Sequence, residues 1–109
     1  MFKWNTVEDL TLPKGLVEIG EGAFTECRKL KNITLPNTLM SIRECAFIHC
    51  SSLEEIDIPE NVKSLDELVF GGCYRLKRVK IHSKDKFKFK GLPFGESVVI
   101  KKGGGKKAY

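Results

Sequence analysis

The sequence predicts an α/β solenoid, a short array of stacked coils with a parallel sheet on the concave face and irregular or 3₁₀-helical turns on the convex face. Three observations predict it: apolar residues recur every 23 positions, each recurrence opens with an alternating apolar pair, and a proline follows three of these pairs. With 109 residues, 41% hydrophobic and 30% charged, the chain has the composition of one globular domain.

The first element of each coil is expected to be a strand. In residues 30–35, Ile33 and Leu35 alternate with polar residues, which is typical of a strand with one buried face. Pro36 then ends the strand, because proline cannot donate to a ladder. We therefore expect parallel strands near residues 9–12, 32–35, 55–58 and 78–81, stacked in sequence order.

The second element is the return segment, residues 16–27 in the first coil. Its apolar residues are spaced by three, four, one and three positions, which suits a helical or 3₁₀ turn better than a second strand. Stacking should convert the repeated positions into internal ladders. These ladders contain Phe24, Phe47 and Phe70, and Cys27, Cys50 and Cys73.

The chain is expected to form a single domain over residues 1–109. Residues 1–6 correspond to the end of an earlier coil with Trp4 as a cap, residues 7–82 hold the repeats, and residues 83–109 form a basic terminal coil. In this last segment Phe87 and Phe89 should face the core from an edge strand. Residues 91–94 are expected to belong to a shortened final coil.

The repeated row, from Ile33-Thr34-Leu35-Pro36 through Ala46-Phe47 and Cys50 to Leu53, resembles the BspA-like class of leucine-rich repeats. Residues 98–109 resemble the terminal strand and K-x-A-Y ending of such arrays, with Lys102 where a proline is expected. The resemblance implies a non-catalytic module that binds other proteins, chiefly in surface proteins of bacteria or protists. The N-terminus lacks an export signal, so the sequence leaves open a cytoplasmic location or surface display after signal removal.

The outward positions of the expected strands form the candidate partner-binding face. They are polar and charged, and the third and fifth positions of each row are Asp9, Asn32, Glu55 and Arg78, and Thr11, Thr34, Asp57 and Lys80. Charges also alternate between neighbouring rows, which favours a structural ladder over a calcium or acid–base site at residues 54–57. The expected pairs are Glu8–Lys31, Lys31–Glu54, Glu54–Lys77, Glu55–Arg78 and Asp57–Lys80.

A second hypothesis comes from the charge distribution. The net charge is +5, but residues 1–73 carry −5 and residues 74–109 carry +10. A basic segment with interleaved aromatics can bind nucleic acid or another polyanion. The lysines concerned are Lys86, Lys88, Lys90, Lys101, Lys102, Lys106 and Lys107. Self-association through the ends of a short array is a third hypothesis.

Neither catalysis nor a bound cofactor is expected. The sequence contains no G-x-S-x-G, H-E-x-x-H or P-loop motif. A metal site at Cys45, His49 and Cys50 is disfavoured because no paired C-x-x-C accompanies it, and all four cysteines are expected to be free thiols. The longest uninterrupted aliphatic or aromatic run has three residues, which excludes membrane insertion by a helix.

Overall fold

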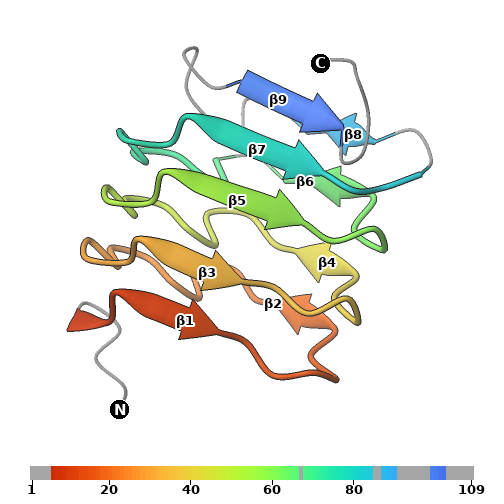
Figure 1. Cartoon of the computed structure of the whole chain (residues 1–109), viewed down its shortest axis with the longest axis horizontal. Coiled ribbons are helices and arrows are strands. Elements are labelled where there is room, and N and C mark those ends of the chain that lie inside the picture. Colours follow the sequence, from red (N-terminus) through yellow and green to blue (C-terminus); the bar gives the residue numbers. More distant parts are fainter. Residues whose placement is uncertain (1–5, 67, 85–86, 91–98, 103–109) are drawn as a thin grey trace.

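The computed structural model describes residues 6–66, 68–84, 87–90 and 99–102, which form a solenoid-like stack of coils (Figure 1). Each complete coil contains one longer and one short strand, in two layers that run in opposite directions. The longer strands are β1 (Asp9–Thr11), β3 (Asn32–Thr34), β5 (Glu55–Ile58), β7 (Arg78–Ile81) and β9 (Val99–Lys102). The short strands are β2 (Glu18–Ile19), β4 (Ser41–Ile42), β6 (Ser64–Leu65) and β8 (Lys88–Phe89).

The strand registers confirm the 23-residue period. Leu10 lies opposite Ile33 and Ile56 opposite Val79, both in parallel pairs. Val79 lies opposite Ile100, only 21 residues later, so the last coil is shortened as the sequence predicts. We number the coils by the period: coil 1 is residues 7–29, coil 2 is 30–52, coil 3 is 53–75, and coil 4 begins at residue 76.

The return segments match the prediction in part: irregular turns are present, but no helical or 3₁₀ turn is described in coils 1 to 3, and a two-residue strand precedes each turn. They contain the short strands β2, β4, β6 and β8, followed in coils 1 to 3 by irregular turns rather than helical ones. Within these turns residues have positive φ at two positions per coil, four residues apart: 22 and 26, 45 and 49, 68 and 72. A residue in the left-handed region cannot continue a right-handed helix, so the turns do not become helical.

Along the turns of coils 1 and 2, successive backbone N–H groups donate alternately to a carbonyl in the same coil and to a carbonyl in the next coil. The N–H of Ala23 donates to Gly20 in its own coil, whereas the N–H of Phe24 donates to Ala46 in coil 2. The same pattern recurs one coil later, where the N–H of Phe47 donates to Val69. The turns are thus stacked by hydrogen bonds in the manner of a ladder, which satisfies their buried backbone groups.

The strands are parallel and stacked in sequence order as predicted, but the sheet they form is divided into separate ladders. Strand pairing gives β1–β3 and β5–β7–β9 on the long-strand side, and β2–β4 and β6–β8 on the short-strand side. Neither β3 with β5 nor β4 with β6 is paired by a ladder. Both layers therefore lack a hydrogen-bonded ladder at the same place, between coils 2 and 3.

The core is continuous across this boundary. The rings of Phe24 and Phe47 stack at 5.4 Å between centroids, and those of Phe47 and Phe70 at 5.6 Å, which confirms the phenylalanine ladder. Phe87 is buried and Phe89 packs half-buried against the core, as predicted, although of the two only Phe89 lies within a strand, β8. Trp4 and residues 91–94, to which the sequence assigns a cap and a shortened coil, lie outside the described residues.

Candidate partner-binding face

The long-strand face is the outward side of β1, β3, β5 and β7. Its eight outward residues fall in the two predicted columns: Asp9, Asn32, Glu55 and Arg78, and Thr11, Thr34, Asp57 and Lys80. All are exposed except Lys80, which is half-buried. Their neighbours Ile33, Ile56 and Val79 point into the core, as strand alternation requires.

Three of the five predicted charge pairs are present on and beside this face. Lys31 Nζ lies 3.4 Å from Glu8 Oε1, and Arg78 Nε lies 3.5 Å from Glu55 Oε2. Lys77 Nζ is 4.0 Å from Glu54 Oε1. Because more than half of each charged side chain is exposed in the first pair and about half in the second, these pairs fix the register more than they add stability.

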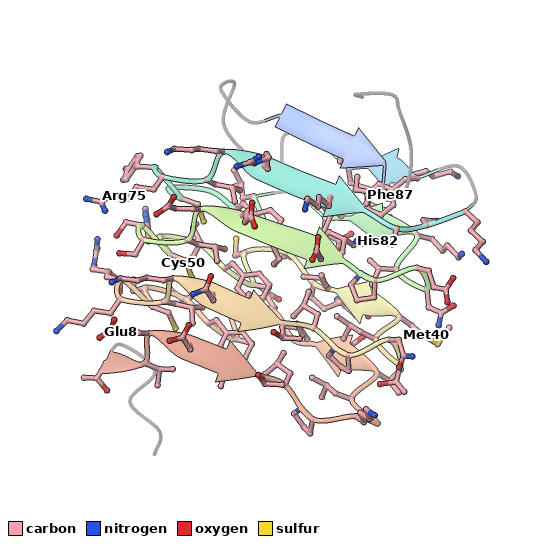
Figure 2. The ribbon with its side chains drawn as sticks, in the orientation of Figure 1. Glu8, Met40, Cys50, Arg75, His82 and Phe87 are labelled. Atoms are coloured by element: carbon pink, nitrogen blue, oxygen red, sulfur yellow. The ribbon has the colours of Figure 1, made fainter. Side chains whose placement is uncertain are left out.

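The other two predicted pairs do not form among the described residues. Lys31 contacts Glu8 in the preceding coil and not Glu54 in the following one. Asp57 contacts His82 instead of Lys80: His82 Nε2 lies 3.4 Å from Asp57 Oδ1. Figure 2 marks the position of His82. His82 takes the place in which the other strands have proline, so its N–H can donate to Ile58, which proline cannot do.

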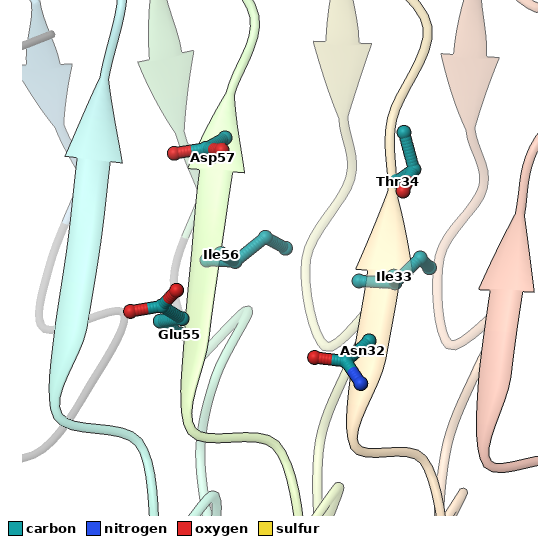
Figure 3. Close-up of a pocket in the computed structure, with 6 residues that line it drawn as sticks. All are labelled: Asn32, Ile33, Thr34, Glu55, Ile56 and Asp57. Atoms are coloured by element: carbon teal, nitrogen blue, oxygen red, sulfur yellow. The ribbon is translucent and has the colours of Figure 1, made fainter.

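Asn32 is held in place by its neighbour in coil 1. Its Nδ2 donates to Asp9 Oδ1 at 2.8 Å, which turns the amide oxygen away from β1 (Figure 3). A shallow depression of about 150 Å³ lies beside it, between β3 and β5. Its lining consists of Asn32, Ile33 and Thr34 from β3 and Glu55, Ile56 and Asp57 from β5.

The comparison with protein families matches the model of the BspA-type leucine rich repeat region over residues 1–97, with six copies of the repeat. The chain belongs to this family. The leucine-rich repeat is generally a non-catalytic module that mediates contacts between proteins. No curated protein and no solved structure gives a significant match to the chain.

Only some of the lysines proposed to bind a polyanion lie in the part of the leucine-rich repeat that the structure describes. Lys88 and Lys90 are exposed at the edge strand β8, and Lys90 Nζ lies 3.5 Å from Asp66 Oδ1. Lys86, Lys106 and Lys107 lie outside the described residues, and Lys101 and Lys102 are described only as part of β9. In the described segments no helix is long and apolar enough to cross a membrane.

The cysteine ladder of the leucine-rich repeat lies in the interior. Cys27, Cys50 and Cys73 are buried, Cys45 is half-buried, and all four are free thiols (Figure 2). Cys50 Sγ donates to the carbonyl of Phe24 at 3.2 Å, and Cys73 Sγ donates to that of Phe47 at 3.1 Å. Burial raises the pKa of Cys27 to about 12. Across the ranges that the structure describes, no cluster of His, Cys, Asp and Glu suits a metal ion.

Sequence reasoning missed two features of this face: the contact of His82 with Asp57 and the lack of a ladder between the described strands β3 and β5. The first could have been found, because His82 lies where the preceding coils have Pro36 and Pro59. The second has no signal in the repeat pattern, because Ile33 and Ile56 occupy equivalent positions in equivalent strands. Only the strand pairing in the structure shows it.

Proposed function

We propose that this chain binds a partner protein through the long-strand face. The observation that supports the proposal is the alignment of two outward columns, eight polar or charged side chains on one side of β1, β3, β5 and β7. The ladders β1–β3 and β5–β7 each hold their outward side chains at fixed spacing, so a partner meets two preorganised halves of one surface. Membership in the leucine-rich repeat family supports recognition rather than catalysis.

The charge of the face favours a partner with both acidic and basic groups. Asp9 and Glu55 bring negative charge to one column, while Arg78 and Lys80 bring positive charge to the coil 4 end of both columns. The asymmetry along the stack fixes the orientation of a partner, because reversing it would place like charges together.

The experiment compares protein capture by three forms of the chain from a cell extract, with and without nuclease treatment. The first is wild type, the second carries Asn32→Ala, Thr34→Ala and Arg78→Ala on the long-strand face, and the third carries Lys29→Ala, Ser52→Ala and Arg75→Ala on the turns. Quantitative mass spectrometry should show a protein retained by the first and third forms and lost from the second. Equal capture by all three would refute the proposed face, and capture abolished by nuclease would favour the polyanion hypothesis.

A further inference from the structure

Both sheet layers lack ladder pairing at one boundary, which we call the seam: the junction of β3 with β5 and of β4 with β6. Hydrogen-bonded ladders join the strands of coils 1 and 2 and those of coils 3 and 4, but none joins coil 2 to coil 3. A second depression, of about 470 Å³, accompanies the seam on the short-strand side. Ser41 and Ile42 line it from β4, and Ser64 lines it from β6.

The ion pairs divide the molecule at the same boundary. Arg43 pairs with Glu18 in coil 1, while Lys90 pairs with Asp66 in coil 3. Among all ion pairs between described residues, those that join different coils connect coil 1 with coil 2 or coil 3 with coil 4. They are Lys31–Glu8, Arg43–Glu18, Lys77–Glu54, Arg78–Glu55, His82–Asp57, Lys84–Glu60 and Lys90–Asp66.

The backbone groups that face the seam can be assigned from the ladders on either side. Asn32 N–H donates to Glu8, and Thr34 C=O accepts from Leu12, so both residues turn their backbone groups toward β1. Since alternate residues of a parallel strand bond to opposite neighbours, the groups of Ile33 face β5. At the two ends of β5, the carbonyls of Glu54 and Ile58 accept hydrogen bonds from coil 4. By the same rule, the backbone groups of Glu55 and Asp57 face β3.

The contacts that do cross the seam lie mostly on the turn side. The N–H of Phe47 donates to Val69 at 2.9 Å, and that of His49 donates to Gly71 at 2.7 Å. Cys73 Sγ also reaches the carbonyl of Phe47. At the opposite end of the longer strands, a side-chain bond between described residues crosses from Asn61 Nδ2 to the carbonyl of Asn37 at 2.9 Å.

We propose that the seam is a hinge. Coils 1 and 2 form one unit, coils 3 and 4 form the other, and they move relative to one another about the hydrogen-bonded turn column of residues 47–49 and 69–71. Little opposes this motion within the sheets, because ladder bonds and ion pairs are both absent between the described strands of coils 2 and 3. Opening changes the separation of Asn32 and Thr34 from Glu55 and Asp57, and with it the curvature of the long-strand face. In a stack of repeats, the weakest interface between neighbours is where such motion concentrates.

Amide hydrogen exchange measured by NMR tests the open ladder. In β3 the N–H of Ile33 should exchange at least about tenfold faster than those of Asn32 and Thr34, because only Ile33 faces the seam. In β5 the N–H of Asp57 should likewise exchange faster than those of Ile56 and Ile58. Uniform protection along either strand would overturn the hinge, since it would mean that β3 and β5 are paired.

Relaxation dispersion of methyl groups separates a moving hinge from a static gap. Ile33, Ile42 and Ile56 adjoin the seam and should show exchange on the microsecond-to-millisecond timescale, whereas Ile81, within the β5–β7 ladder, should not. Thr34→Lys, which places an ammonium opposite Asp57, should reduce this exchange, and Thr11→Lys, within the closed β1–β3 pair, should leave it unchanged. Flat dispersion profiles at the seam methyls, or equal profiles in both variants, would overturn the proposal.

Discussion

The imidazole of His49 lies against Gly72 so closely that a Cβ at position 72 would collide with the ring. The two residues occupy the same position in coils 2 and 3, and their φ angles are 61° and 71°. A side chain in one coil therefore fills the space that the next coil leaves free. This is a local packing relationship that the 23-residue period alone does not specify.

Gly72→Ala should lower the free energy of unfolding by about 2–4 kcal/mol, because alanine pays the left-handed penalty and also displaces His49. Urea denaturation measures the loss. Gly20→Ala is the matched control, since nothing lies within 4 Å of a Cβ there, and it should leave stability unchanged or slightly raised. If His49→Ala fails to restore part of the stability lost in Gly72→Ala, the collision is not the cause.

Leu68 offers the opposite change. It is 44% exposed and has a φ of 57°, in the column that Gly22 occupies in coil 1. Leu68→Asn should raise stability by roughly 0.5–1 kcal/mol, because asparagine tolerates the left-handed region better than leucine. Leu68→Val should lower stability, since a β-branched residue is strained there. Thermal midpoints should fall in the order Leu68→Asn, wild type, Leu68→Val. A Leu68→Val variant as stable as Leu68→Asn would contradict the prediction.

Phe47→Ala tests the stacked ring ladder. Phe47 is fully buried between Phe24 and Phe70, so the truncation should cost ~3–5 kcal/mol and can unfold a domain of marginal stability. Val17→Ala, at a site that is 51% exposed, should cost less than about 0.5 kcal/mol. Chemical denaturation monitored by circular dichroism gives both values. A loss below about 1 kcal/mol for Phe47→Ala would contradict an internal ladder.

The buried thiols predict a loss of stability at alkaline pH. Burial raises the pKa of Cys27 from 9.0 to about 12, so the unfolded chain releases this proton at a lower pH than the folded one. The contribution of the Cys27 thiol to the free energy of unfolding is complete below about pH 9. It declines between pH 9 and 12, because the unfolded state binds fewer protons than the folded state there. Cys27→Ala should lose less stability than wild type between pH 8 and pH 11 in urea titrations. Parallel losses in the two proteins would show that Cys27 does not carry the effect.

Alkylation tests the redox state of the same ladder. In the native protein Cys45 should react first, because it is half-buried whereas Cys27, Cys50 and Cys73 are buried. Intact-mass analysis after alkylation in denaturant, without reductant, should show four adducts. Two adducts or none would reveal disulfides, and would favour an oxidising compartment.

Much of the fold follows from the sequence because inward positions recur with one period. Ile33, Ile56 and Val79 align in the sequence, and in the structure they are buried in parallel strands. Alternation along each strand then places Asn32, Glu55 and Arg78 outward, so the candidate face was also predictable. The return segments were not, since the spacing of Leu16 and Ile19 does not distinguish a helical turn from a two-residue strand flanked by turns.

The sequence by itself determined which side chains stack, because a residue repeated at a fixed period faces the same way in every coil. Tertiary structure alone decided how the stack is held. Whether β3 pairs with β5 is decided by the combined packing of the core and turns, because the two strands carry equivalent positions of the repeat. Whether Asp57 meets Lys80 or His82 depends on side-chain reach, since both lie on the neighbouring coil. Periodicity fixes direction, but distances between coils arise only when all coils pack together.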